Sequence, residues 1–292
     1  MTDPPTPRRE RMAPAERVRA RLRAAAGEAV AEAMPDGYQR LGRVLLLRLP
    51  ESLRPYGPTI GSAWKEELGV ATVLAVSGPV AGEYREPQVE RLAGTDTETE
   101  VVEHGVRWRF DAARLMFAAG NRTERQRAGR LARPGESVVD LFAGIGYFTI
   151  PAARAGAARV VAVEKNPVAV HYLRENVRRN GVADRVEVRP GDNREVPLAR
   201  GEADRVFLGY LPSAIPWVTR ALDLLRPSGG WIHVHLVVDA RGALRHAADT
   251  VEAAVRAGGG VLLAPPQARE VKPYGPGRTH AVVDARVRPR RP

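Results

Sequence analysis

An apolar stretch that runs directly into a glycine-rich turn constrains this chain more than any other feature of its sequence. Val138-Val-Asp-Leu-Phe142 is followed by Ala143-Gly-Ile-Gly146 and then by a second apolar run that reaches Pro151. Glycines allow the backbone to approach a ligand closely, and open α/β sheets bind ligands at the carboxyl ends of their strands. We therefore expect a strand, a ligand-binding turn and the start of a helix, in this order.

The residues after this turn alternate between strand-like and helix-like patterns. Strands are predicted over residues 137–142, 159–164, 186–189, 205–210 and 231–238, and helices over 151–155, 167–180, 215–225 and 240–257. Such alternation predicts an α/β fold with a mostly parallel, Rossmann-like sheet and helices on both faces. A last apolar run, 280–287, is predicted to pair antiparallel at the edge of this sheet.

The first hundred residues predict a smaller α/β unit. The predicted elements are a disordered, proline-rich leader at 1–14, a basic helix at 15–34, strands at 43–49 and 71–76, a helix at 60–68, and a strand-like stretch at 99–110. The sequence therefore predicts three parts: a basic leader and helix over 1–35, a small α/β domain over 36–98, and a Rossmann-like catalytic domain over 99–292.

Three sets of polar residues lie at the spacing that a bound nucleoside needs. Glu164 ends the second strand of the large domain, where its carboxylate can accept hydrogen bonds from both ribose hydroxyls. Asp192 and Asn193 follow the third strand, where they can meet an adenine amino group. Asp140 can either hold the glycine turn or reach the far end of the ligand. Each acid alone is equally well explained as a helix cap or a solvated loop residue, but their joint spacing favours a nucleoside site.

The glycine pattern argues against a dinucleotide. A dinucleotide fingerprint needs a third glycine, G-x-G-x-x-G, whereas Gly144-Ile-Gly146 is followed by Tyr147 to Ile150 without one. A nucleoside that lacks a pyrophosphate fits better.

Composition narrows the possible classes of protein. The chain has no cysteine, which excludes disulfides, thiolate metal sites and cysteine nucleophiles. A formal net charge of +11 favours a polyanionic partner, although only three of the 45 basic residues are lysines and such an arginine bias can also reflect genome composition. No apolar run approaches the roughly 20 residues of a membrane span, so we expect no membrane and a cytoplasmic location. The oligomeric state stays open.

Two histidines alternate on one predicted strand, His233 and His235. A strand places them on the same face, which is compatible with a metal site, but no third ligand is apparent. A core or supporting role is favoured, and we expect no metal.

Several segments together resemble one enzyme family. They are Phe110-Asp-Ala-Ala-Arg-Leu-Met-Phe-Ala-Ala-Gly-Asn121, Glu124-Arg125, Asp140 to Pro151, Val163-Glu-Lys-Asn-Pro167, Gly191-Asp-Asn-Arg194, Ala203 to Val206 with Gly209-Tyr210, and Lys272-Pro-Tyr-Gly-Pro-Gly277 with His280. Over roughly residues 40 to 290 the chain resembles the tRNA wybutosine-synthesising 3-amino-3-carboxypropyltransferases. These are relatives of the tRNA guanine N1-methyltransferases within the class I S-adenosylmethionine (SAM)-dependent methyltransferase superfamily.

The resemblance implies a reaction and its cofactor. Such enzymes transfer the 3-amino-3-carboxypropyl arm of SAM to a modified guanine beside the tRNA anticodon and release methylthioadenosine. The implied partner is therefore tRNA. The residues expected to contact the cofactor are Arg125, Asp140, Phe142, Gly144, Gly146, Glu164, Lys165, Asp192 and Asn193.

One departure within the family favours arm transfer over methylation. The guanine methyltransferases carry Asn-Leu-Pro after the fourth strand, whereas this chain has Leu208-Gly-Tyr-Leu-Pro-Ser213. Tyr210 and Ser213 are the expected catalytic residues because they can line the acceptor pocket, although Tyr210 is equally well explained as a packed aromatic. A guanine N1-methyltransferase, and arm transfer to a peptide or small molecule, remain as alternatives. The residues before position 40 are too few and too proline-rich for the additional module with which relatives recognise the tRNA elbow.

Overall fold

The computed structural model describes residues 12–290 and divides them into two compact units. The first unit extends to Val101 and includes Asp111–Met116; the second consists of Val102–Phe110 and the chain from Phe117 onward. Most of the proposed leader, residues 1–11, lies outside the described residues, whereas Pro14 already begins a helix.

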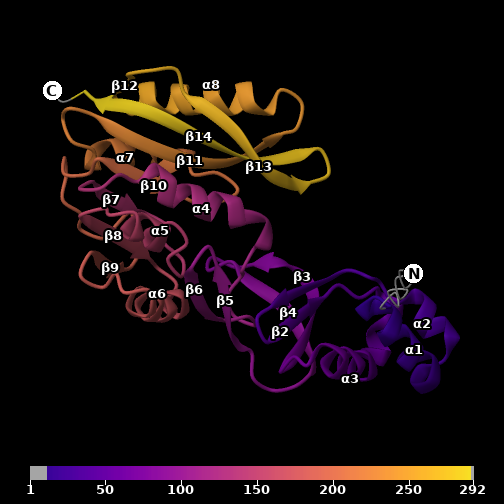
Figure 1. Ribbon diagram of the computed structural model, residues 1–292. Coiled ribbons are helices and arrows are strands. Elements are labelled where there is room, and N and C mark those ends of the chain that lie inside the picture. The colour runs from indigo at the N-terminus through magenta and orange to yellow at the C-terminus, as the bar shows by residue number, and fades with distance from the viewer. Residues whose placement is uncertain (1–11, 291–292) are drawn as a thin grey trace, which may run out of the picture. The chain divides into compact units, whose positions relative to one another are not determined.

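The first unit is a four-stranded sheet covered by helices (Figure 1). Its elements are α1 (Pro14–Ala26), α2 (Glu28–Ala33), β1 (Tyr38–Leu41), β2 (Val44–Leu47), η1 (Glu51–Tyr56), α3 (Gly57–Leu68), β3 (Thr72–Ala81) and β4 (Glu86–Ala93). The strand order is β1-β2-β3-β4, with β2 and β3 parallel and the outer pairs antiparallel. Strands β1 and β4 were not predicted, because their burial alternates and they carry many polar residues.

The predicted helix at 15–34 is two helices. Gly27 has φ +93°, a backbone conformation that a helix cannot contain, and it separates α1 from α2. The apolar face of α1 is buried through Val18 and Leu22 in the same core as Leu45 and the fully buried Trp64. The basic helix therefore shares the hydrophobic core of the small sheet.

The second unit contains the predicted alternation of strands and helices. Its elements after the link between the units are η2 (Ala119–Asn121), α4 (Arg122–Leu131), β7 (Ser137–Asp140), α5 (Thr149–Arg154), β8 (Arg159–Glu164), α6 (Pro167–Arg179), β9 (Val186–Pro190), β10 (Arg205–Leu208), η3 (Ile215–Trp217), α7 (Val218–Leu224), β11 (Gly230–Asp239), α8 (Ala243–Ala257), β12 (Gly260–Leu262), β13 (Gln267–Gly275) and β14 (Arg278–Pro289). Helix α4 and strands β12 and β13 were not predicted.

The stretch 99–110 was predicted as one strand and is a two-stranded sheet. Strands β5 (Glu98–Glu103) and β6 (Val106–Asp111) flank a turn in which His104 has φ +50° and Gly105 φ +75°. Glycine at the second position allows this tight reversal. The pattern missed the turn because it contains only two residues.

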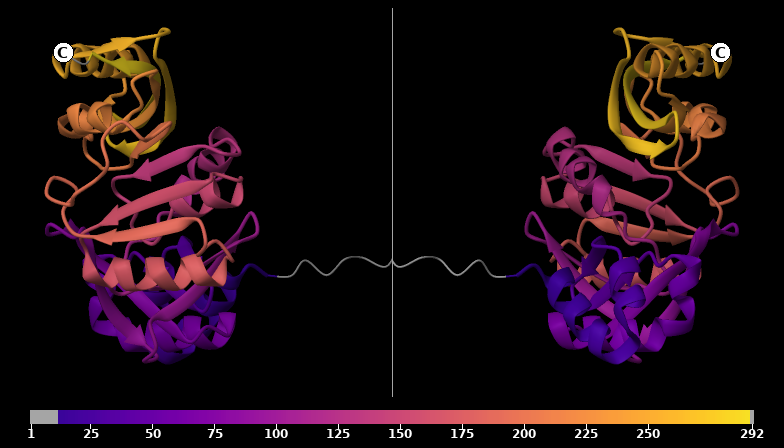
Figure 2. Two further views of the ribbon diagram at one scale, coloured as in Figure 1. Left: turned by 90° about the vertical axis from the view of Figure 1, so that its left-hand side faces the viewer. Right: turned by 90° about the vertical axis from the view of Figure 1, so that its right-hand side faces the viewer.

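The order of strands in the large sheet is β12-β14-β11-β10-β7-β8-β9, and β13 also pairs with β14. Strands β7 to β11 are parallel, and β14 is antiparallel to β11. The prediction that the last strand forms the edge was wrong, because β14 pairs with β11 on one side and with β12 and β13 on the other. The side views in Figure 2 show these C-terminal strands beside α8.

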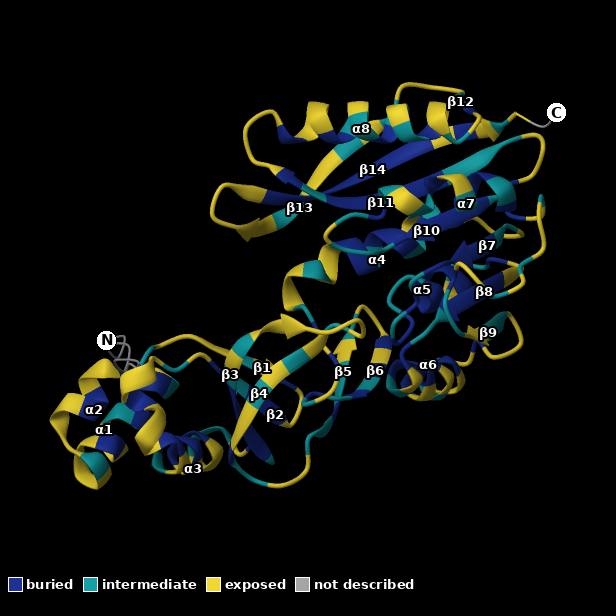
Figure 3. Cartoon of the chain, turned by 180° about the vertical axis from the view of Figure 1, so that it is seen from behind, coloured by how far each residue is buried: buried dark blue, intermediate teal, exposed yellow. Residues whose placement is uncertain are grey.

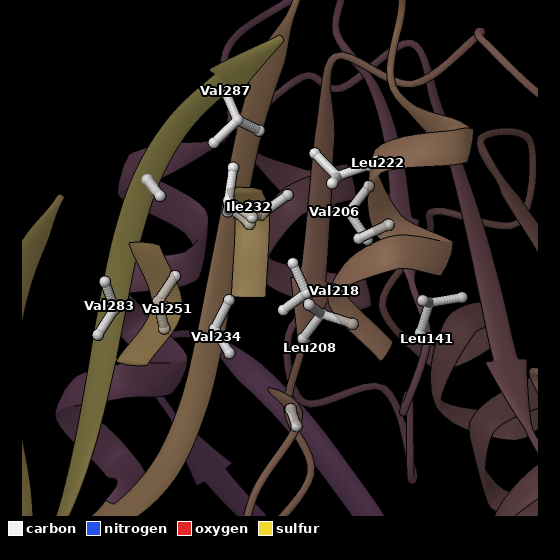
Figure 4. Packing of buried hydrophobic residues seen from close by; sticks show 14 of the residues in the cluster. Leu141, Val206, Leu208, Val218, Leu222, Ile232, Val234, Val251, Val283 and Val287 are labelled. Carbon is white, nitrogen blue, oxygen red and sulfur yellow. The ribbon is translucent and has the colours of Figure 1, made fainter. Parts of the chain in front are cut away.

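The two faces of this sheet differ in chemistry. Helices α7 and α8 bury one face in a large aliphatic core that includes Val206, Ile232 and Val283 (Figure 4). The buried positions of α8 recur every four residues, and the other side of the helix is exposed (Figure 3). Because side chains alternate along a strand, Arg205 and His233 point to the opposite face, which is polar and faces α4.

Candidate cofactor and acceptor site

The strand order creates a topological switch point near the centre of the large sheet. Strand β7 lies between β8, which follows it in the chain, and β10, which the chain reaches only after crossing back. The Leu141 N–H donates to the carbonyl of Phe207 at 3.1 Å, so the loops after β7 and β10 leave the same edge side by side. Ligands of open α/β sheets bind at such topological switch points.

The glycine loop after β7 has the shape that its sequence predicts. Gly144 and Gly146 have φ of +55° and +105°, which side chains other than glycine rarely adopt. A Cβ on Gly146 would lie 2.7 Å from the Cδ1 atom of Ile150, so the loop also needs glycine for close packing. The loop presents main chain, without side chains, at both glycine positions.

Glu164 is bound to this loop. Its Oε2 atom accepts a hydrogen bond from the Gly144 N–H at 2.8 Å, and its Oε1 atom accepts one from the Asn166 N–H at 2.8 Å. Burial raises the pKa of this carboxyl, while the two main-chain donors oppose the rise. A carboxylate has about four lone-pair sites, so Glu164 can still accept hydrogen bonds from hydroxyls such as those of ribose.

Asn193 presents an unsatisfied acceptor beside the loop. Its Nδ2 atom donates to the carbonyl of Leu141 at 2.9 Å, which orients the amide. Its Oδ1 atom is buried and, among residues 12–290, has no hydrogen-bond partner. An unpaired buried acceptor is unfavourable by about 1–3 kcal/mol, and an amino group such as that of adenine would satisfy it. This orphan oxygen fits an adenine nucleoside.

Asp192 forms ion pairs with Lys165 and with its neighbour Arg194. The Asp192 carboxylate lies 3.5 Å from the Lys165 Nζ atom and forms a two-pronged pair with Arg194, at 2.5 and 2.9 Å. The Arg194 guanidinium lowers the pKa of Asp192 below its usual range. Asp192 therefore stays ionised and accepts hydrogen bonds at all ordinary pH values.

Asp140 is placed to hold the turn. It is fully buried, and its Oδ2 atom accepts a hydrogen bond from the Thr149 hydroxyl at 2.8 Å while Oδ1 accepts one from the Phe142 N–H at 3.3 Å. These bonds join the start of the loop to the first residue of α5. Burial raises the pKa of Asp140 to about 7.

An aromatic cluster lies where the loops after β7 and β10 meet. The ring of Phe142 is 5.1 Å from that of Tyr210 and 5.0 Å from that of Trp217, and the latter pair is edge-on. All three are half-buried, so they can offer a flat apolar surface to a planar ligand. Trp217 was not predicted, since it lies outside the matched motifs. Ser213 uses its hydroxyl oxygen to accept the Ile215 N–H at 3.3 Å, which leaves its O–H proton able to donate.

Arg125 is buried against the glycine loop. Its guanidinium donates to Glu103 at 2.7 and 2.9 Å and to the Ala118 carbonyl at 3.0 Å. It also lies 4.4 Å from the ring centroid of Phe117 and 5.6 Å from that of Tyr147, which belongs to the glycine loop. The sequence identified Arg125 but not Glu103, because that partner is 22 positions away and on another element.

The two histidines of β11 belong to a buried polar network. The Nδ1 atom of His233 lies 2.6 Å from Asp284, which also pairs with Arg127 of α4. His235 lies 2.8 Å from His280, and burial lowers the pKa of both to about 3. Within residues 12–290 no group of three or more His, Cys, Asp or Glu side chains is arranged to hold a metal ion. No helix in that range is long and apolar enough for a membrane span.

Comparison with known families agrees with this arrangement. Residues 99–261 match the TRM5/TYW2 methyltransferase domain, and residues 18–97 match the TYW2 N-terminal domain. The chain belongs to the TRM5/TYW2 family. The match to the N-terminal domain begins at residue 18, upstream of position 40 where the sequence motifs placed the start of the resemblance, so most of α1 lies in the matched region.

Individual relatives in the TRM5/TYW2 family cover most of the chain. A tRNA(Phe) (4-demethylwyosine(37)-C(7)) aminocarboxypropyltransferase of Pyrococcus horikoshii is 37% identical over 89% of this chain and 92% of its own length. The protein of the same name from Methanocaldococcus jannaschii is 36% identical over 85% of this chain and 97% of its own.

Solved structures agree with the class I methyltransferase fold. The crystal structure of P. horikoshii TYW2 in complex with MeSAdo has a TM-score of 0.82 and 35% identity, and covers 94% of this chain and 98% of that one. A TRM5 relative, the M. jannaschii tRNA m1G37 methyltransferase, has a TM-score of 0.74 at 23% identity, covers 94% of this chain and 79% of that one, and shows the shared fold.

Proposed function

We propose that this chain transfers the 3-amino-3-carboxypropyl group of SAM to carbon 7 of 4-demethylwyosine, a modified guanine beside the anticodon of tRNA(Phe), and releases methylthioadenosine. The observation that carries the proposal is the 37% identity to an aminocarboxypropyltransferase of this specificity over 92% of that enzyme's length. The relative from P. horikoshii that was crystallised with MeSAdo, the by-product of this reaction, supports the same chemistry.

The site residues fit the nucleoside part of the donor. In this proposal Glu164 accepts hydrogen bonds from the ribose hydroxyls, and the unsatisfied Oδ1 atom of Asn193 accepts one from the adenine amino group. Asp192 stays ionised beside Lys165 and adds a second acceptor at the adenine end. Gly144 and Gly146 bring the main chain close to the ligand, while Asp140 holds the loop in place.

The reaction itself is an in-line displacement. SAM supplies a sulfonium whose neighbouring carbons are all electrophilic. A carbon–carbon bond forms between the acceptor carbon and the arm, the carbon–sulfur bond breaks, its electron pair stays on sulfur, and the acceptor carbon loses a proton. Methyl transfer has the same geometry, so the enzyme selects the product by aligning one arm with the acceptor.

The aromatic cluster is the proposed acceptor surface. Phe142 and Tyr210 follow the two strands at the switch point, and Trp217 contacts both rings. A tricyclic base can stack on such rings, and stacking of a base on an aromatic side chain contributes about 1–3 kcal/mol. The hydroxyl of Ser213 can donate a hydrogen bond to the acceptor. Tyr210 and Ser213 are thus proposed to position the base.

Analysis of the nucleoside by-product tests the proposal. The purified protein is incubated with SAM and tRNA(Phe) that carries the 4-demethylwyosine precursor, and the products are separated by chromatography. Methylthioadenosine is expected. S-adenosylhomocysteine would instead identify a methyltransferase, the activity of the TRM5 branch of the family. Methylthioadenosine formed only with a peptide or small-molecule acceptor would replace the tRNA part of the proposal.

The tRNA partner and a cytoplasmic location belong to the same proposal. The net charge of +11 supports a polyanionic partner, and a TRM5 relative with 25% identity was crystallised as a complex with a leucine tRNA. A cytoplasmic location follows from a tRNA substrate.

A further inference from the structure

Two cationic side chains from different elements approach one short segment, Ala118 to Asn121. Arg125 of α4 donates its Nη1 hydrogen bond to the carbonyl of Ala118 at 3.0 Å. Lys272 of β13 passes directly over Gly120: a Cβ built on this glycine would lie 2.9 Å from the Lys272 Cδ atom and 3.5 Å from its Nζ atom. The missing side chain at Gly120 is what gives the lysine room to lie against the main chain.

Of these two cationic side chains, Arg125 has an acidic partner and Lys272 does not, within residues 12–290. Arg125 is neutralised by Glu103, which is 11% exposed and lies 2.7 Å away. For Lys272 the part of the chain that the structure describes provides neither a hydrogen bond nor an ion pair, although its side chain is half-buried. Burial, and secondly the nearby Arg125, lower the pKa of Lys272. A partly buried ammonium without a counter-ion is unfavourable, and a bound anion would relieve the cost.

The neighbours of Lys272 do not supply that anion. Its partner across the β13–β14 ladder is His280, which is 1% exposed and has a pKa lowered to about 3, so it is neutral at ordinary pH. The Nδ1 atom of His280 is also buried without a hydrogen-bond partner among residues 12–290. Glu124, the acid near His280, is already bound to Arg127 through both oxygens at 2.5 and 2.8 Å. The uncompensated charge is therefore that of Lys272.

Arg125, whose charge acts on Lys272, lies at one end of the glycine loop. The guanidinium of Arg125 is 5.6 Å from the ring of Tyr147, at the far end of the loop, whereas Gly144 at the near end is bound to Glu164. In SAM a carboxylate lies beyond the sulfonium on the arm, and the ribose lies on its other side. With ribose at Glu164, the arm can therefore follow the loop toward Arg125 and Lys272.

We propose that Lys272 binds the carboxylate of the aminocarboxypropyl arm of SAM, and that it thereby fixes the arm for transfer. The inference rests on the proposed function, because it assigns a role within the same donor site. Half-burial beside Gly120 and Arg125 favours the carboxylate of a small ligand over an RNA phosphate, which is ordinarily met by exposed cations. Only three lysines occur in this arginine-rich chain, and the other two are Lys65 and Lys165.

Three ligands that differ in the arm test the assignment. Lys272→Met removes the charge and keeps the length of the side chain. Calorimetry should show its dissociation constant for SAM raised about 10-fold or more, since hydrogen bonds to charged groups are the stronger ones. The constant for methylthioadenosine, which lacks the arm, should not change. Decarboxylated SAM, which keeps the amine and lacks only the carboxylate, should bind the variant and the unaltered protein equally.

Lys65→Met is the matched control. Lys65 lies on α3 in the first unit and is exposed, so its loss should leave all three dissociation constants unchanged. An unchanged affinity of Lys272→Met for SAM would overturn the assignment, as would an equal loss for SAM and methylthioadenosine. A loss of tRNA affinity with unchanged SAM affinity would assign the lysine to a phosphate and also overturn it. Formation of S-adenosylhomocysteine by the unaltered protein would instead refute the proposed function, independently of these binding constants.

Discussion

At the scale of single residues, side chains of the candidate site both form contacts within the protein and present groups that can bind a ligand. Glu164 holds the glycine loop through two main-chain N–H groups and also presents its remaining lone pairs toward the site. Asn193 orients itself on the Leu141 carbonyl and leaves its oxygen unpaired. Arg125 likewise packs on Tyr147 while it neutralises Glu103. A substitution at any of these positions is therefore expected to alter the protein's own structure together with the proposed ligand binding.

Glu164→Gln should weaken SAM binding. The amide keeps the volume of the side chain but replaces one acceptor by a donor, which then faces either the loop N–H groups or a ribose hydroxyl. The loss of a charge-assisted hydrogen bond is worth about 1.5–3 kcal/mol, so the dissociation constant should rise roughly 10- to 100-fold by calorimetry. Glu252→Gln is the control, because Glu252 pairs with Arg256 within α8, far along the chain from the candidate site residues. Equal affinities of the two variants for SAM would contradict the ribose assignment.

At the scale of elements, the polar face of β11 and β14 ties α4 to the sheet. Arg127 of α4 pairs with Asp284 of β14, which pairs with His233 of β11, and His233 lies 2.6 Å from Arg205 of β10. These bonds connect four elements across one face. The His235 ring also stacks on Phe148 of the glycine loop at 5.2 Å. The network therefore packs against the glycine loop through His235. Removing one partner of a buried pair of this kind lowers the free energy of unfolding by about 3–5 kcal/mol.

The free energy of unfolding should decrease as the pH is lowered, because of His235 and His280. Their pKa values are lowered from 6.5 to about 3 by burial, so between these values the unfolded chain takes up protons that the folded protein does not. Each histidine therefore contributes stability that is present above pH 6.5 and is lost as the pH falls toward 3. In a His235→Gln/His280→Gln variant this loss is absent.

Urea unfolding at pH 7 and pH 5.5 measures the effect. The free energy of unfolding of the unaltered protein, relative to the variant, should fall by on the order of 2 kcal/mol between the two pH values. Asp140, whose pKa is raised to about 7, changes stability in the opposite direction, but it is present in both proteins and cancels in the difference. A difference that does not vary with pH would show that the two histidines are not buried as neutral groups.

At the scale of the whole molecule, charge is the property that suits a tRNA substrate. The excess of 45 basic over 34 acidic residues comes from the second unit, because basic and acidic residues nearly balance in the first, and arginine supplies nearly all of it. Many arginines already pair with acids of the chain, such as Arg17 with Glu67 in the first unit. The long-range field of the remaining charge attracts a polyanion and raises its rate of association.

Binding of tRNA should depend steeply on salt, whereas binding of SAM should not. If about three to five phosphates are contacted, the tRNA affinity should fall roughly 10- to 500-fold between 50 and 200 mM salt. Filter binding or fluorescence anisotropy with tRNA measures this slope, and calorimetry with SAM in the same buffers is the internal control. A tRNA affinity that does not vary with salt would count against a phosphate-binding surface.

Much of the fold, and the residues of the candidate nucleoside site, could be predicted from local patterns. Strand β7, the glycine loop, Glu164 and Asn193 follow from short segments whose period and glycine positions have few structural solutions. The interior position of β14 in the sheet could not be predicted from the sequence, because the sequence of an apolar strand is similar whether one or both of its edges are paired. Its buried positions on both faces were the signal that an interior position was possible.

Long-range pairings were decided by the tertiary structure alone. Glu103 meets Arg125, Trp217 meets Phe142, and Lys272 lies over Gly120, although none of these pairs is close in sequence. The physical reason is that helix and strand periods describe only how a residue sits within its own element. Which elements become neighbours depends on the free energy of packing the whole core, to which distant residues contribute together.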